Sequence, residues 1–230
     1  MRFITDKKIV FPAFIVLMML GCSSDPASNE IYWQDIHTRE LRSFFEKQDI
    51  AVRHIGIGNA GGIHLDLRGS NFTDLSMLFG MPLEVLLLAN TSIQDLSYLR
   101  DMRFLRKLDL SSTKVKDLTP LAALSIEELN ISNTEVVDLE PIRKLPIRML
   151  SFVNTDVRDL SPLESMPIET VFFSTNKIVG KVNLRILQEK ASIRCINLYG
   201  DVRQFWAENY GINYSTVSPP PTATTTPTAP

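Results

Sequence analysis

The chain has 230 residues, of which 44% are hydrophobic and 22% are charged, and its formal net charge is −2. This composition is typical of a soluble folded protein, and the length is sufficient for a sizeable hydrophobic core. Because the charge is nearly balanced, the chain offers no strongly basic surface for phosphate groups, and we do not expect nucleic acid as a partner.

Residues 1–21 have the layout of an export signal. Lys7 and Lys8 precede an apolar run from Ile9 to Leu20, which ends at Gly21 and Cys22. A helix rises only ~1.5 Å per residue, so this run is too short for the ~30 Å hydrocarbon core, and a transmembrane helix is the poorer interpretation. The segment Met19-Leu20-Gly21-Cys22 resembles the lipobox of bacterial lipoproteins, in which the cysteine thiol carries diacylglycerol.

The resemblance implies a lipoprotein signal peptide over residues 1–21 and lipidation at Cys22. It also implies a protein anchored by its acyl chains in a cell membrane or outer membrane, on the extracytoplasmic side. Residues 22–30 are mostly small and polar, which suits a tether. The alternative is an ordinary signal peptide with a chance cysteine. If Cys22 is lipidated, Cys195 is a lone thiol, which we interpret as a half-buried strand residue rather than a reactive group.

Residues 31–62 are predicted to form an N-terminal cap. Apolar residues recur near helical spacing between Ile31 and Gln48. Two short apolar stretches then flank Gly61 and Gly62, a pattern typical of a strand, a turn and a second strand. A repeat array needs such a cap because an uncovered end exposes its core.

Residues 63–199 carry a repeat whose successive units begin 21 or 22 residues apart. Alternate residues of each predicted strand are apolar and are expected to point inward. These pairs are Leu65/Leu67, Leu86/Leu88, Leu108/Leu110, Leu129/Ile131, Leu150/Phe152 and Val171/Phe173. The period leaves no room for a long helix between strands.

The repeated pattern L-x-x-L-x-L-x-x-T-x-V-x-D-L-x-P-L resembles the leucine-rich repeats of bacterial surface proteins, including the internalin type. The resemblance covers roughly half of the chain. It implies an α/β fold: a right-handed solenoid with a parallel β-sheet on its concave face, a short 3₁₀ or irregular convex side, and helical caps.

Beyond Asn176 the pattern loosens. Leu184, Ile186 and Leu187 indicate a helix, and Ile193, Ile196 and Leu198 indicate a seventh repeat strand. Residues 200–217 are predicted to form a C-terminal cap helix, and residues 218–230, which are rich in proline and threonine, a disordered tail.

Three polar columns recur along the repeats. The first is interpreted as hydroxyls and amides that bond adjacent turns, as the family's asparagine ladder implies: Ser70, Thr91, Thr113, Thr134, Thr155 and Asn176. The second is interpreted as caps of short helical turns, with calcium binding as the alternative: Asp74, Asp95, Asp117, Asp138 and Asp159. The third alternates in sign and is interpreted as a charge ladder that sets the register: Glu84, Arg106, Glu127, Arg148, Glu169 and Arg194.

Function in such a fold is expected on the outward strand positions, which are free of core packing. Apolar side chains in a polar field there predict a protein-binding face with an apolar centre and a polar rim. The candidates are His64, Asp66, Arg68, Val85, Leu87, Lys107, Asp109, Glu128, Asn130, Met149, Ser151, Val153, Thr170, Phe172, Asn197 and Tyr199. Leu87, Phe172 and Met149 are expected to supply affinity, with charged neighbours fixing orientation.

His64 and Asp66 are two apart on one strand and are predicted to be able to form a hydrogen-bonded pair. No ligand set for zinc and no nucleophile accompanies them, so we expect no catalytic residue, no metal site and no cofactor. The predicted function is recognition of another macromolecule, most naturally a protein whose identity the sequence does not give. The alternatives are a structural spacer of the cell envelope and a glycan-binding module.

Overall fold

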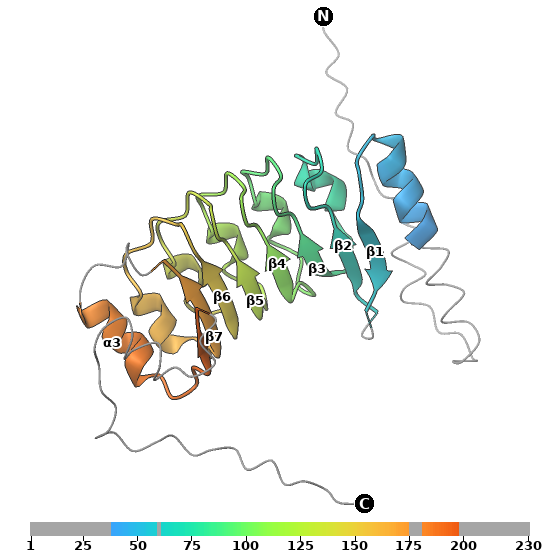
Figure 1. Cartoon of the computed structure of the whole chain (residues 1–230). Coiled ribbons are helices and arrows are strands. Elements are labelled where there is room, and N and C mark those ends of the chain that lie inside the picture. The colour runs from blue at the N-terminus through green and yellow to red at the C-terminus, as the bar shows by residue number, and fades with distance from the viewer. Residues whose placement is uncertain (1–37, 59–60, 175–180, 198–230) are drawn as a thin grey trace, which may run out of the picture.

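The computed structural model describes residues 38–58, 61–174 and 181–197. It contains an eight-stranded sheet in which the strands follow one another in chain order (Figure 1). β1 pairs with β2 antiparallel, and every later pair up to β8 is parallel. The predicted signal peptide, Cys22, the tether, Asn176, Tyr199, the C-terminal cap helix and the tail lie outside the described residues.

The elements are short throughout. The strands are β1 (His54–Ile57), β2 (Ile63–Asp66), β3 (Leu83–Leu87), β4 (Lys107–Asp109), β5 (Glu128–Asn130), β6 (Met149–Phe152), β7 (Thr170–Phe173) and β8 (Cys195–Ile196). The 3₁₀ helices are η1 (Leu75–Leu78), η2 (Ser97–Leu99), η3 (Thr119–Leu121), η4 (Glu140–Ile142) and η5 (Ser161–Ser165), and the last helix is α3 (Lys181–Glu189).

The strand leucines form the core because the repeat places a leucine at the equivalent position of each neighbouring strand. Leu86 lies beside Leu108, which lies beside Leu129, and all three are buried. Alternate residues of a strand point to opposite faces, so one face of each strand is committed to this core. The predicted inward positions are confirmed, and together with the parallel sheet and the 3₁₀ turns they confirm the solenoid.

The 3₁₀ helices stack behind the sheet, and each contacts the next along the first four repeats (Figure 1). Each begins just after an aspartate whose Oδ1 accepts the backbone N–H two residues later. At Asp117 the acceptor lies 2.8 Å from the Thr119 nitrogen, and the other four aspartates of the column do the same. The capping interpretation of this column is confirmed.

Bonds between repeats at the strand ends come from a different column than expected. Each threonine hydroxyl bonds a carbonyl of its own repeat, as Thr113 does with Leu110 at 2.6 Å. The residue just before each threonine carries the inter-repeat bond, as when the Asn133 N–H donates to the Val153 carbonyl at 2.8 Å. The prediction that the hydroxyls bridge adjacent turns was therefore wrong.

This neighbouring column has left-handed backbone, with φ near 55–58° at its non-glycine positions and 70° at its glycine. Its members are Gly69, Asn90, Ser112, Asn133 and Asn154. Glycine and asparagine adopt this conformation at the lowest cost. The tight exit from each strand therefore explains the residue types.

The N-terminal end is covered by a helix over residues 38–47 and by the hairpin β1–β2. Phe45 of the helix is fully buried and packs edge-on against Phe72 of the first repeat, with ring centroids 6.3 Å apart. The helix and the hairpin predicted for this end are present where the structure describes it. At the other end α3 packs on η5, and Ile196 of β8 continues the core row beside Val171.

No helix in the described ranges has the length and apolar character that crossing a membrane requires.

Candidate functional site: the concave face of the sheet

The outward side chains of the sheet form rows across the strands, and we call this surface the concave face. The first row is His64, Val85, Lys107, Glu128, Met149, Thr170 and Cys195. The second row is Asp66, Leu87, Asp109, Asn130, Ser151 and Phe172. The sheet thus brings the predicted candidates from seven repeats together on one surface.

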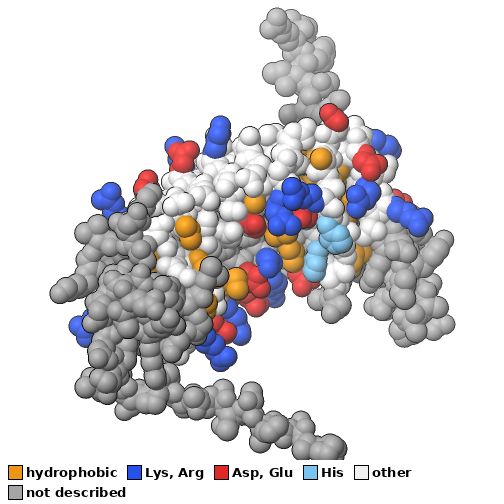
Figure 2. Space-filling view, viewed as in Figure 1, with side chains coloured by type: hydrophobic (Ala, Val, Ile, Leu, Met, Phe, Trp, Pro, Cys, Tyr) orange, Lys and Arg blue, Asp and Glu red, His pale blue; other side chains and the backbone are white. Residues whose placement is uncertain are grey.

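The apolar residues of this face fall into two separate zones. Val85 and Leu87 lie on β3, whereas Met149, Val153 and Phe172 belong to the β6–β7 end. Met149 is 40% exposed and the others are half-buried. Figure 2 shows hydrophobic side chains on this face interspersed with charged ones. The predicted apolar centre is therefore replaced by two apolar zones on either side of polar strands β4 and β5.

Asp66 and Arg68 pair with each other at the N-terminal end of the face. The Arg68 guanidinium donates to both carboxylate oxygens of Asp66, at 2.9 and 2.6 Å, and the Arg68 backbone N–H donates to the same carboxylate at 3.1 Å. The hydrogen bonds from Arg68 lower the pKa of Asp66, although partial burial of the carboxylate opposes them. Asp66 is therefore held ionised by its own neighbour.

The polar strip on β4 and β5 is also satisfied internally. Lys107 Nζ lies 2.5 Å from Glu128 Oε2 across the two strands. Asp109 accepts the backbone N–H and the hydroxyl of Ser111, at 3.0 and 2.7 Å. Asn130 likewise accepts the backbone N–H of Ser132 at 3.1 Å. These side chains already bond one another within the protein. They therefore make the surface polar but offer few unpaired hydrogen-bonding groups to a partner.

The Ser132 hydroxyl extends this network to Ser151, 2.7 Å away on the next strand. Near the other end, the Asn197 side chain accepts the backbone N–H of Phe173 at 2.7 Å. Asn197 therefore stabilises the edge between β7 and β8, which is a structural role for one predicted binding residue.

His64 contacts Glu84 instead of Asp66, so the predicted pairing was wrong. Its Nε2 lies 3.5 Å from Glu84 Oε2, and neither atom has a hydrogen-bond partner or contact with solvent. The register between β2 and β3 is irregular at this point: Ile63 pairs with Leu83 and His64 with Val85, so Glu84 has no partner residue on β2. Gly58 and Gly62 lie against this pair, and a Cβ at either position would fall within 2.7 Å of the Glu84 carboxylate.

The alternating charge column lies along one margin of the concave face and forms ion pairs at every second step. Arg106 lies 3.7 Å from Glu127, and Arg148 lies 3.2 Å from Glu169. The backbone of this column is continuously bonded, for the Arg148 N–H donates to the Glu127 carbonyl at 2.8 Å. The charge-ladder prediction is confirmed for these two pairs.

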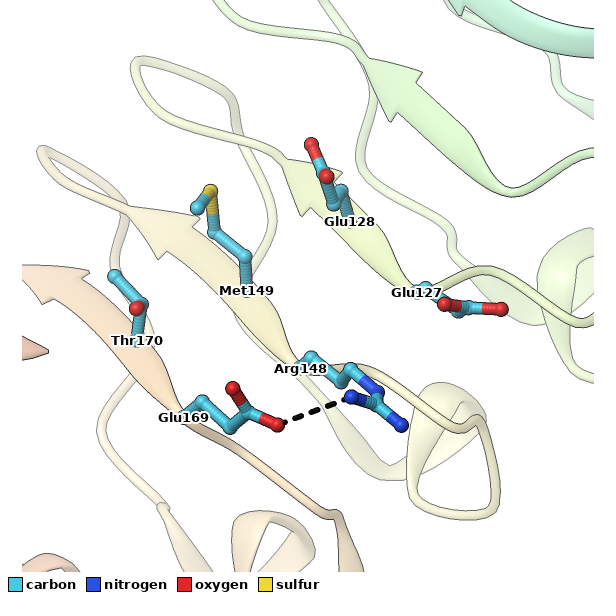
Figure 3. A pocket seen from close by; sticks show the side chains of 6 residues that line it. All are labelled: Glu127, Glu128, Arg148, Met149, Glu169 and Thr170. Atoms are coloured by element: carbon cyan, nitrogen blue, oxygen red, sulfur yellow. Dashed lines mark hydrogen bonds and ion pairs between the residues drawn. The ribbon is translucent and has the colours of Figure 1, made fainter. Parts of the chain in front are cut away.

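A depression of about 200 Å³ opens beside this margin (Figure 3). It is lined by Glu127, Glu128, Arg148, Met149, Glu169 and Thr170. Figure 3 shows Arg148 and Glu169 joined between two adjacent strands, with Met149 following Arg148 on one strand and Thr170 following Glu169 on the other. Because its carboxylates are paired with basic neighbours, the depression is a contoured part of the surface and offers no unpaired acid or base.

The described ranges contain no group of three or more histidine, cysteine or acidic side chains arranged to hold a metal. Cys195 is a free, half-buried thiol on β8, and the exposure agrees with its interpretation as a strand residue. Asp117 and Asp159 have lowered pKa values because Thr119 and Ser161, respectively, donate hydrogen bonds to them, which is the behaviour of caps.

Sequence reasoning missed several residues of the surface. Glu84 was placed in the charge column, but its contact with His64 on the neighbouring strand was not predicted. Three aromatic residues away from the concave face are strongly exposed: Phe79, Tyr98 and Phe104. They could have been found by comparing each repeat with the next, because later repeats carry small, polar or proline residues at the positions of the first two.

A family model described as leucine-rich repeats (two copies) matches residues 83–123. Among solved structures, internalin C2 from Listeria monocytogenes is similar, with a TM-score of 0.52 and 28% sequence identity. The chain is a leucine-rich-repeat solenoid.

The similarity of this solenoid to internalin C2 covers 56% of the present chain and 57% of that chain, so it spans little more than half of the relative. An internalin (inlF) from the same species is matched with a TM-score of 0.43 and 17% identity, over 58% of this chain and 46% of that one. Comparison with curated protein sequences finds no match.

Proposed function

We propose that this leucine-rich-repeat protein binds another protein through its concave face, as a recognition module that catalyses no reaction. The observation that carries the proposal is an apolar zone of one exposed side chain, Met149, and two half-buried ones, Val153 and Phe172, beside polar groups that are already paired. Removing apolar surface from water favours association, whereas the paired polar groups lose little when they are covered.

The distance between the two apolar zones indicates how large the partner's contact surface must be. Leu87 and Phe172 lie in the same row of the sheet but are separated by Asp109, Asn130 and Ser151. With adjacent strands about 4.8 Å apart, the two side chains are about 19 Å from each other. A protein surface of ordinary interface size spans both zones, whereas one small ligand does not.

The similarity to internalin C2 is a similarity of fold. Fold alone never establishes function, so the proposal rests on the surface residues named above.

We also propose that the chain is exported and lipid-anchored through Cys22, and this part rests on the lipobox-like segment Met19–Cys22. A fatty acid that carries an alkyne, fed to expressing cells, is expected to label the wild-type chain. The Cys22→Ala variant should lose the label, and Cys195→Ala should keep it. Equal labelling of the Cys22→Ala variant and wild type would refute the anchor.

The partner can be identified by photo-crosslinking on intact cells. A photoreactive amino acid at position 149 or 172 is expected to capture one protein that the same group at position 137 does not capture. Val137 is a suitable control because it is 59% exposed and lies outside the sheet. Identical capture from all three positions would mean that the concave face is not selective.

A further inference from the structure

The solenoid has a second exposed apolar surface, on its first two repeats. Phe79 is 63% exposed, Tyr98 is 46% exposed and Phe104 is 66% exposed. Phe79 ends η1, Tyr98 lies within η2, and Phe104 lies in the loop from η2 to β4. Because η1 and η2 contact each other, Phe79 and Tyr98 lie at neighbouring turns, and Phe104 follows η2 in the same repeat as Tyr98. We call the three the aromatic patch.

The repeats themselves show that folding does not require these aromatics. The position of Tyr98 is occupied by proline in the next three repeats, at Pro120, Pro141 and Pro162. The position of Phe79 is occupied there by Ala122, Arg143 and Glu164. Later repeats therefore build the same 3₁₀ turn from small, polar or proline residues.

Phe104 belongs to an insertion. Two residues, Arg103 and Phe104, separate Met102 from Leu105, whereas a single residue, Ser125, separates Leu124 from Ile126 one repeat later. This extra residue accounts for the one repeat of 22 residues. The insertion leaves a phenylalanine exposed to solvent, so that the first two repeats carry three exposed aromatic side chains.

Basic side chains accompany the patch. Arg100 follows Tyr98 within one turn and Arg103 adjoins Phe104, and both are exposed. Neither is among the ion pairs of the described residues, and the exposed Asp101 lies between them in the sequence. Aromatic rings with adjacent unpaired guanidinium groups are suited to the interface of a bilayer with anionic headgroups, where rings sit at headgroup depth and arginines meet phosphates.

We infer that the aromatic patch rests on the surface of the membrane in which the chain is anchored. This inference depends on the proposed anchor at Cys22 for the proximity of a bilayer. The 16 positions from Cys22 to Thr38 span at most about 55 Å when extended. This reach is long enough for any face of the solenoid to meet the bilayer, so the patch sets the orientation. The concave face is then left uncovered for a protein partner.

The test uses the full chain attached to vesicles by a defined bond. In a Cys195→Ser background, Cys22 is coupled to a maleimide lipid in vesicles of phosphatidylglycerol and brominated phosphatidylcholine. Trp33→Phe and Trp206→Phe remove the native tryptophans, and a single tryptophan is introduced as Phe104→Trp or as Val137→Trp. The bromines are placed on the acyl carbons nearest the headgroups, because bromine quenches tryptophan only at short range and the rings are expected at headgroup depth.

The expected result is several-fold stronger quenching for Phe104→Trp than for Val137→Trp. Adding Arg100→Gln and Arg103→Gln should weaken it, as should replacing phosphatidylglycerol by phosphatidylcholine. Equal quenching at both positions overturns the inference. So does an unquenched Phe104→Trp signal that shifts with protein density, because that result means a protein contact. Because the bond to the vesicle is made chemically, the outcome does not depend on whether cells lipidate Cys22.

Discussion

The Arg68 guanidinium donates one hydrogen bond to each carboxylate oxygen of Asp66, from Nε at 2.9 Å and from Nη2 at 2.6 Å. Both residues belong to the concave face, and the pairing converts two charged groups into one neutral, rigid unit. The Asp66 side chain is only 10% exposed, whereas that of Arg68 is 42% exposed. The arginine therefore covers the carboxylate at the surface.

Arg68→Ala is expected to destabilise the solenoid, because it leaves a mostly buried carboxylate without its main donor. A group deprived of its partner in this way costs about 1–3 kcal/mol of unfolding free energy. Denaturant unfolding measures the loss. Arg103→Ala is the control, since Arg103 is exposed and forms no ion pair among the described residues. An equal loss of unfolding free energy in both variants would show that the pairing of Arg68 with Asp66 does not stabilise the fold.

Acid should weaken the fold partly through Asp66. Its pKa is lowered in the folded state, chiefly by the Arg68 hydrogen bonds, so the unfolded chain binds the proton more readily. The resulting stability is present above the ordinary aspartate pKa of about 4 and is lost as the pH falls through the lower folded value. Asp66→Asn is expected to flatten stability against pH in this window. A curve parallel to that of wild type would contradict the assignment.

The left-handed column offers a backbone test at Asn133, whose φ is 56°. Alanine is disfavoured in this conformation and glycine is not. Both Asn133→Ala and Asn133→Gly lose the side-chain bond from Asn154, so they differ only in backbone preference. We expect the alanine variant to be the less stable by about 1 kcal/mol in thermal or denaturant unfolding. The reverse ranking would show that the strand exit is not the constraint.

The hairpin glycines predict a graded response. A Cβ at Gly62 would lie 2.5 Å from the Cβ of Glu84, which no rotation of the glutamate relieves. A Cβ at Gly58 would meet only the ends of the His64 and Glu84 side chains, which are able to turn away. Gly62→Ala should therefore cost roughly 1–3 kcal/mol and Gly58→Ala less, by the same unfolding measurement. Adding both His64→Ala and Glu84→Ala should restore Gly58→Ala and not Gly62→Ala, because the Cβ of residue 84 remains.

The repeats were predictable because one physical requirement recurs at a fixed period. Each strand must bury its alternate residues against the next, so Leu86, Leu108 and Leu129 reveal the core row directly. The capping aspartates were predictable for the same reason, since every 3₁₀ turn needs an acceptor at its start. A local requirement that recurs at a fixed period can therefore be predicted from the sequence.

The sequence did not predict which of several nearby residues a polar side chain bonds. Sequence spacing favours a pair of His64 with Asp66, but Arg68 has the longer reach and the fixed guanidinium geometry that match the carboxylate. His64 instead lies against Glu84 of the neighbouring strand. The backbone bonds between repeats start one residue before the predicted threonine column. That position holds glycine, asparagine or serine, as at Gly69, Asn90 and Ser112, so its residue types vary where the threonine column is nearly uniform.

The most direct test of the central claim is the affinity of a purified captured partner for three variants. Met149→Glu and Phe172→Glu place a charge in the β6–β7 apolar zone, and Val137→Glu places one at an exposed site outside the sheet. With melting curves confirming that each variant folds, we expect both concave variants to lose about 2 kcal/mol or more of binding free energy, roughly 30-fold in Kd. Val137→Glu should bind like wild type. Unchanged affinity in the folded Met149→Glu and Phe172→Glu proteins would contradict recognition through the concave face.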